Sequence, residues 1–350
     1  SLINYNLLND NLKKVKIKNY ESKLGDNIPI NVINIDKFFY SLNYKGDLLK
    51  FNEKGKLLKK YEIKEDIKNK IPTSFLLIKD EFVIAYKSGE ILKTDKAGNI
   101  KWIFKKNKLL NSPIKYYEGN LIILYFDEII FLSLFDGEII FQENYPSNNV
   151  IQSSGGKIVN YFNLIYFLLP NSELNIVDTF IFEEHITKLN SKKFLTTLNN
   201  LNDNIHIHGN YFVYLDNGNS IYTYDIVNEK FLLSDFKLNR ITSSIFFNNS
   251  LITKNDNDIE FYNIINGKLF NGISIKGVLK KKSKLIKAII NNKDLNLFTN
   301  QGEVIILDKK LNIKNIVDLN INKINSINNY QNQLYFLSED GISYVLKWIF

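Results

Sequence analysis

The sequence predicts an all-β fold, an eight-bladed β-propeller of four-stranded antiparallel blades. Three observations predict it: a turn pattern that returns eight times, apolar runs of strand length before these turns, and no window with a helical apolar stripe. The composition agrees, because 25 Phe and 20 Tyr among 350 residues suit the pleated surface of a strand. Repeat folds often use this length as one domain, so we expect a single propeller over residues 1–350.

The repeat is clearest in two copies, YKGDLLKFNEKGKLL and KSGEILKTDKAGNIKW. Each copy contains two glycines nine residues apart, Gly46 and Gly55 in the first and Gly89 and Gly98 in the second. Glycine is expected there because hairpin turns need positive φ. Copies of the first turn are anchored at Gly46, Gly89, Glu128, Ser172, Gly218, Asp258, Gly302 and Gly341. The anchors stand 39 to 46 residues apart, which matches one four-stranded blade per repeat.

The two ends of the chain predict how the ring closes. The last repeat has only one strand after Gly341, at residues 342–346, so its outermost strand is missing. Residues Leu12 to Lys18 form an alternating strand that has no blade of its own. We therefore expect this N-terminal strand to complete the blade that contains Gln333 to Leu346, which removes an open sheet edge.

The pattern from Gly89 to Trp102 resembles the PQQ-like repeat of quinoprotein-type propellers. The resemblance implies that Trp102 packs between neighbouring blades. Two further copies are similar, with Leu58 or Tyr61 in the first and Phe141 in the third where that family has its tryptophan. The later repeats keep the spacing of the turns but not the residues of the motif.

Within that family the chain looks most like the BamB-type lipoprotein, because it has eight repeats and no inserted domains and ends one strand after Asp340-Gly341. The similarity implies a non-catalytic scaffold that assists assembly and insertion of outer-membrane β-barrel proteins. It also implies a periplasmic location, attachment to the outer membrane through a lipid anchor outside this sequence, and a monomer when alone. The partner would be the periplasmic domains of the barrel-inserting protein BamA.

The resemblance also places a candidate partner site after the third repeat, where the BamB-type group carries a contact loop. The residues are Asn148, Asn149, Val150, Ile151 and Gln152. Pro146 blocks ladder pairing and Ser-Asn-Asn favours a turn, so Val150 and Ile151 would be exposed on a loop. Alternatively, these two residues begin the innermost strand of the fourth blade. The family's arginine has no match here, and Gln152 stands nearest to its place.

The residues provide little for chemistry. The chain has no cysteine, whereas a quinoprotein dehydrogenase carries an adjacent cysteine pair, so we expect no cofactor and no catalytic residue. His206 and His208 share one strand face and could begin a metal site with Asp203, but exposed strand histidines are the favoured interpretation. Two alternatives stay open: an enzyme or sugar-binding propeller that uses the central funnel, and a generic protein-interaction propeller.

The charge does not indicate a nucleic-acid partner. The formal net charge is +8, but the lysines are scattered along the chain and do not interleave with aromatics as along a nucleic-acid groove. The one tight cluster, Lys280 to Lys284, is interpreted as a solvated loop. The sequence begins at Ser1 and has no Met, which favours a processed N-terminus. No apolar run approaches the roughly 18 residues that span a bilayer.

Overall fold

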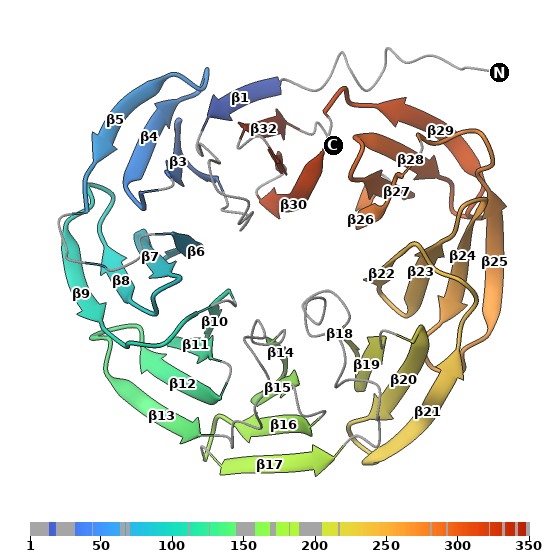
Figure 1. Cartoon of the computed structure of the whole chain (residues 1–350), viewed down its shortest axis with the longest axis horizontal. Helices are drawn as coiled ribbons and strands as arrows, with labels where there is room; N and C mark the ends of the chain where they lie inside the picture. The colour runs from blue at the N-terminus through green and yellow to red at the C-terminus, as the bar shows by residue number, and fades with distance from the viewer. Residues whose placement is uncertain are drawn as a thin grey trace.

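Each repeat folds into one four-stranded antiparallel sheet, and eight such blades form a ring (Figure 1). The computed structural model describes residues 14–18, 32–43, 45–63, 67, 71–110, 113–125, 127–144, 158–168, 173–181, 183–188, 205–215, 218–280, 282–291, 293–321, 323–330, 333–339 and 342–347. Within these residues there is no helix. The predicted all-β, eight-bladed propeller is confirmed.

The blades follow one another in chain order around the ring (Figure 1). Blade 1 contains β2 (Ile33–Ile35), β3 (Phe38–Leu42), β4 (Leu48–Asn52) and β5 (Leu57–Tyr61). Blade 2 contains β6 (Pro72–Ile78), β7 (Glu81–Tyr86), β8 (Ile91–Thr94) and β9 (Ile100–Phe104). Blade 3 contains β10 (Lys115–Tyr117), β11 (Asn120–Leu124), β12 (Glu128–Ser133) and β13 (Ile139–Asn144). Blade 4 contains β14 (Ile158–Tyr161), β15 (Leu164–Leu168), β16 (Glu173–Asp178) and β17 (Glu183–Lys188).

The second half of the ring repeats this order, with the first strand of each blade innermost (Figure 1). Blade 5 contains β18 (Ile205–His208), β19 (Tyr211–Leu215), β20 (Ser220–Asp225) and β21 (Lys230–Lys237). Blade 6 contains β22 (Ser243–Phe247), β23 (Ser250–Lys254), β24 (Asp258–Asn263) and β25 (Leu269–Ser274). Blade 7 contains β26 (Leu285–Asn291), β27 (Asp294–Thr299), β28 (Glu303–Leu307) and β29 (Ile313–Asp318). Blade 8 contains β30 (Ile324–Tyr330), β31 (Gln333–Ser338), β32 (Ile342–Lys347) and β1 (Lys14–Lys18).

The core consists of apolar clusters between neighbouring blades. Side chains alternate along a strand, so each blade packs against both of its neighbours. In β11, Leu121 and Ile123 face blade 2, whereas Ile122 and Leu124 face blade 4. A middle strand is therefore buried on both sides, which explains the uninterrupted apolar runs in the sequence.

The N-terminal strand closes the ring. β1 pairs antiparallel with β32, from Lys14 opposite Leu346 to Lys18 opposite Ile342, and forms the outermost strand of blade 8 (Figure 1). Blade 8 in turn packs on blade 1, where Tyr335 and Val345 meet the cluster around Phe39. The predicted closure is confirmed for residues 14–18, and Leu12 and Lys13 lie outside the described residues.

Two kinds of turn emerge at opposite ends of the blades. Because successive strands run antiparallel, the turns after the first and third strands lie at one face of the ring, which we call the turn face. The turn after the second strand and the connections between blades lie at the other, the connection face. The first glycine of the repeat belongs to the connection face, as Gly46 and Gly89 show with φ of 73° and 100°. In blade 5 the left-handed residue is Asn219 (φ 63°), the neighbour of the predicted anchor Gly218.

Candidate functional site

The turn face is built from two turns per blade that are bonded to each other. The first residue after the third strand donates its amide to a carbonyl in the turn between the first two strands. These bonds join Leu134 to Gly119, Thr179 to Asn163, Ile226 to Asn210 and Ile264 to Asn249, at 2.9, 2.9, 2.8 and 3.0 Å respectively. Blades 3 to 6 therefore present their two turns side by side as one rigid unit.

A side-chain cap fixes the tip of the outer turn, the turn between the third and fourth strands, in blades 1 to 7. The last residue of the third strand, or the residue directly after it, is Ser, Asp or Asn. Its side-chain oxygen accepts a hydrogen bond of 2.8–3.2 Å from the amide two residues later. The capping residues are Asn52, Asp95, Ser133, Asp178, Asp225, Asn263 and Asp308. The capped residues, which we call the tip residues of blades 1 to 7, are Lys54, Ala97, Phe135, Phe180, Val227, Ile265 and Lys310.

The tip residues change character around the ring. Phe135, Phe180 and Val227 are 87%, 77% and 64% exposed, and they come from the consecutive blades 3, 4 and 5. Phe162 in the inner turn of blade 4 and Ile181 beside Phe180 are exposed as well, at 73% and 59%. We call these five residues the apolar arc. An exposed cluster of this kind on one face is typical of an interaction surface.

The apolar arc is not required by the turn. Lys54 occupies the same capped position in blade 1, so the hydrogen bonds alone form the turn whatever side chain is at the tip. The sequence interpretation missed the arc, although a signal was present. A Ser, Asp or Asn followed two residues later by a large apolar residue occurs at Phe135, Phe180 and Val227.

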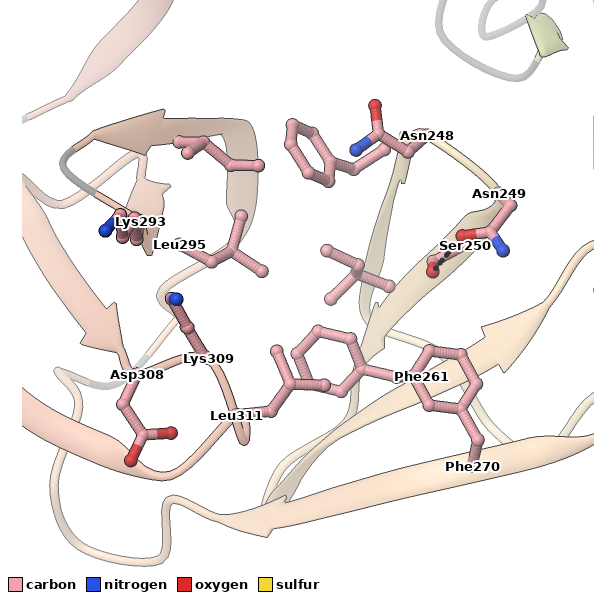
Figure 2. A pocket seen from close by; sticks show the side chains of 13 residues that line it. Asn248, Asn249, Ser250, Phe261, Phe270, Lys293, Leu295, Asp308, Lys309 and Leu311 are labelled. Atoms are coloured by element: carbon pink, nitrogen blue, oxygen red, sulfur yellow. Dashed lines mark hydrogen bonds between the residues drawn. The ribbon is translucent and has the colours of Figure 1, made fainter. Parts of the chain in front are cut away.

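A pocket of about 370 Å³ opens between blades 6 and 7 (Figure 2). Residues of the β22–β23, β26–β27 and β28–β29 turns contribute to it, so it opens on the turn face. Its apolar wall is formed by Phe247, Ile252, Phe261, Phe270, Ile290, Leu295 and Leu311. Lys293, Lys309 and Asp308 lie at its edge, and in Figure 2 the Asp308 carboxylate points away from the pocket.

A second cavity, of about 550 Å³, lies on the inner side of the ring. It is lined by the innermost strands of blades 5 to 8, through residues such as His206, Ser244, Lys287 and Ser326. Its lining is more polar than that of the pocket between blades 6 and 7, which suits a small polar ligand better than an apolar one.

The predicted histidines are partly buried within this inner wall, not exposed. The Nε2 atom of His206 lies 2.8 Å from the Asn248 carbonyl oxygen of blade 6, and its ring stacks on Phe246 with centroids 5.4 Å apart. His208 stacks on His206 at 6.3 Å, and Asp203 lies outside the described residues. Among the residues that the structure describes, no group of three or more His, Cys, Asp or Glu could hold a metal ion.

The other sequence-predicted residues divide into two groups. Asn148, Asn149, Val150, Ile151 and Gln152 lie outside the described residues. Trp102 of β9 reaches the next blade, where its Nε1 donates to the Leu134 carbonyl at 3.1 Å and its ring lies against Gly137.

A buried carboxylate on the connection face is paired with lysines of the same chain. Glu128 at the start of β12 is buried and accepts hydrogen bonds from Lys106, Lys108 and Gln142. Burial alone would raise the pKa of Glu128, but the hydrogen bonds and charges of the two lysines lower it below its ordinary value. The group therefore stays ionised and joins blade 3 to the connection that precedes it.

The lysine cluster is partly engaged in the same way, which the solvated-loop interpretation did not foresee. Lys280 forms an ion pair with Asp318 at 2.6 Å, and its backbone amide donates to the buried Glu303. Ser283 donates to the same carboxylate. Lys281 lies outside the described residues.

Comparison with known proteins places the chain by its fold. No family model matches the sequence, and no curated protein matches it. BamB from Moraxella catarrhalis has a similar structure, with 14% identity, a TM-score of 0.67, and 96% of this chain and 100% of that chain covered. The computationally designed Ika8 protein is similar at 12% identity and a TM-score of 0.67, over 96% and 99% of the two chains.

Sqt1 from Saccharomyces cerevisiae is also similar, at 12% identity and a TM-score of 0.63, over 92% of this chain and 95% of that chain. At these identities the likenesses show the fold, which this chain shares with BamB. In the described part of the chain, no helix has the length and apolar character needed to cross a membrane.

Proposed function

We propose that this chain is a non-catalytic scaffold that binds a protein partner through the apolar arc of its turn face. The observation that carries the proposal is the exposure of Phe135, Phe180 and Val227 at equivalent capped positions of three consecutive blades. The same capped turn forms with lysine in blade 1 and alanine in blade 2, so the turn does not require a large apolar side chain at its tip.

Side chains of this kind suit the centre of a protein interface. Burying one Phe or Val side chain contributes about 1.5–3 kcal/mol, and aromatic anchors dominate binding energy at interfaces. Their backbone is already fixed by the caps and by the bonds between turns, so little ordering entropy is lost on binding. Such a surface is prepared for a partner before the partner arrives.

The fold shared with BamB and the resemblance of the repeats support a more specific role. We propose that the scaffold assists assembly and insertion of outer-membrane β-barrel proteins, in the periplasm and at the outer membrane, with a lipid anchor outside this sequence. The proposed partner is the periplasmic part of the barrel-inserting protein BamA. Residues Asn148 to Gln152 are proposed as a second contact on the segment between β13 and β14.

Capture of a partner tests the proposal. The bait is the whole chain, in wild-type form and with Phe135→Ser, Phe180→Ser and Val227→Ser combined. Envelope extract and the purified periplasmic domains of BamA are the two samples. We expect the triple variant to bind at least about tenfold more weakly, because it loses three anchors. A Lys54→Ser, Ala97→Ser variant changes the same tip positions elsewhere and should bind like the wild type.

The two samples separate the general role from the specific one. Equal binding by the triple variant and the wild type would contradict the role of the arc. Loss of an envelope partner without any binding to the BamA domains would keep the scaffold and contradict the specific partner. A folded Val150→Asp, Ile151→Asp variant with unchanged binding would contradict the contact at Asn148 to Gln152.

The inner cavity supports a second candidate function, binding of a small polar ligand on the axis side of the ring. The observation that favours it is a cavity of about 550 Å³ with His206, Lys287 and Asn325 in its wall. Titration with monosaccharides and short oligosaccharides by calorimetry tests this candidate. Lack of any heat of binding at millimolar sugar would contradict it.

A further inference from the structure

The pocket between blades 6 and 7 departs from the packing that the repeat uses elsewhere. At three other interfaces an aromatic residue of one blade lies against a glycine in the outer turn of the next, through its Cβ at Tyr61 and through its ring at Trp102 and Phe236. These pairs are Tyr61 with Gly98, Trp102 with Gly137 and Phe236 with Gly267. At the interface of blades 6 and 7, Leu311 stands nine residues after Gly302, in the place of that glycine.

The residue of blade 6 that faces the Leu311 backbone is an asparagine, not an aromatic residue. Asn271 stands four residues after Gly267, as Trp102 stands four residues after Gly98, and its amide donates to the Leu311 carbonyl at 3.5 Å. Leu311 has a φ of 64°, which is unfavourable for a residue with a Cβ. The repeat has thus replaced its ring-on-glycine contact by a leucine that lines an open apolar pocket.

The edge of the pocket carries positive charge. Lys293 and Lys309 are exposed, and neither forms an ion pair with a carboxylate that the structure describes. Asp308 does not neutralise them, because its Oδ1 accepts the amides of Lys310 and Asn312 at 2.8 and 2.9 Å. Its carboxylate also points away from the pocket (Figure 2), and Lys309 is among the residues that line it.

The size and wall fit one large side chain. The volume of about 370 Å³ lies within the range of about 300–1,000 Å³ that is usual for ligand pockets. Aromatic and aliphatic carbons form most of the wall, and amide groups of Asn248 and Asn249 lie at one edge (Figure 2). An apolar group inside and a carboxylate at the lysines would satisfy both parts of the site.

We infer that this pocket receives a large apolar side chain of the protein partner and that Lys293 and Lys309 bind a carboxylate beside that side chain. The inference rests on the proposed function and adds the chemistry of the recognised segment. The pocket opens on the same face as the apolar arc, so one partner could contact both.

Synthetic peptides test the inference by fluorescence anisotropy with the whole chain. The main probe is a labelled peptide of about ten residues with one Phe between two glutamates, in which the remaining residues are Gly and Ser. Replacing its Phe by Ala should weaken binding about tenfold or more. Replacing its glutamates by lysines should weaken binding to the wild type, and a Lys293→Glu, Lys309→Glu variant should reverse this preference.

The matched control is a Lys37→Glu, Lys54→Glu variant, which reverses the same charges in the corresponding turns of blade 1. It should bind the peptide with glutamates more tightly than the peptide with lysines, as the wild type does. No binding of the main probe at millimolar protein, equal binding of the Ala probe, or an unchanged preference in the Lys293, Lys309 variant would each overturn the inference. Binding of 4-phenylbutyrate as tight as that of the probe would overturn the choice of a peptide over a small amphipathic acid.

The two proposals fail in different ways. If the apolar arc does not bind the partner, the Phe135, Phe180 and Val227 variant captures the whole partner as well as the wild type does. If the pocket does not bind an apolar side chain, the labelled peptide does not bind in the titration, and none of those three side chains takes part in that measurement.

Discussion

The indole ring of Trp102 in blade 2 lies directly on Gly137 in the outer turn of blade 3. A Cβ added at Gly137 would come within 2.7 Å of the Cε3 atom of Trp102, closer than real Cβ atoms approach other heavy atoms. The Trp102 Nε1 completes the contact by donating to the Leu134 carbonyl at 3.1 Å. The glycine is therefore needed both for its φ of 78° and for the space that the ring fills.

We predict that Gly137→Ala destabilises the fold more than an equally left-handed glycine does elsewhere. Alanine at positive φ costs about 1 kcal/mol by itself, and the forced shift of Trp102 adds about 1–3 kcal/mol. Gly119→Ala is the control, because Gly119 has a φ of 87° and nothing within 4 Å of the added Cβ. Urea unfolding measures both, and equal losses would contradict the ring-on-glycine contact.

Removing the closing strand should open the ring. Deleting residues 1–19 exposes the edge of β32 and the apolar face of blade 8, so we expect the melting temperature to fall by many degrees. A shorter deletion of residues 1–11 leaves β1 in place and serves as the control. Calorimetry that shows the same melting temperature for the wild type and the longer deletion would argue against closure by β1.

Acid should weaken the fold partly through Glu128. Its folded pKa lies below the ordinary value, so its ionised form adds stability above the unfolded pKa of about 4.3, and this stability is lost as the pH falls through the folded pKa. Glu128→Gln should lose about 1–3 kcal/mol at pH 7 and show a flatter decline between about pH 5 and pH 3. The free energy of unfolding is measured with urea at each pH. If it falls equally with pH in the wild type and in Glu128→Gln, this carboxylate has no stabilising role.

Substitution of an exposed phenylalanine should affect the free energy of unfolding far less than substitution of a buried one. Phe180 at the tip of blade 4 is exposed, so Phe180→Ser should change the free energy of unfolding by no more than about 0.5 kcal/mol. Phe131 in β12 is fully buried between blades 3 and 4, so Phe131→Ala should cost about 3–5 kcal/mol. A large loss for Phe180→Ser would mean that the arc is part of the core and would undermine its proposed role.

The repeat was readable because its turns have strict backbone requirements. Gly46, Gly89 and Gly302 adopt positive φ at the connection face, and residues of this kind mark a blade from the sequence alone. The apolar run of β7 could also be recognised as a strand, because both faces of this strand are buried. The closing strand followed from counting strands at the two ends, which needed no knowledge of side-chain packing.

The candidate site was harder to predict because it depends on which blades are neighbours. Phe135, Phe180 and Val227 each look like ordinary apolar residues in a strand-rich sequence, and only the common cap places them at equivalent tips. His206 was misjudged for a related reason, because the Phe246 ring that covers it comes from the next blade. The pocket beside Leu311 depends on two blades as well.

Site-specific photo-cross-linking at the tip residues tests the central claim most directly, because one structural position is sampled around the ring. A photoreactive phenylalanine analogue replaces, one at a time, Lys54, Ala97, Phe135, Phe180 and Val227 in the full chain expressed in cells. We predict that positions 135, 180 and 227 form an adduct with the same partner and that positions 54 and 97 do not. Adducts of equal yield at all five positions, or adducts at 54 and 97 alone, would contradict a protein-binding surface formed by the apolar arc.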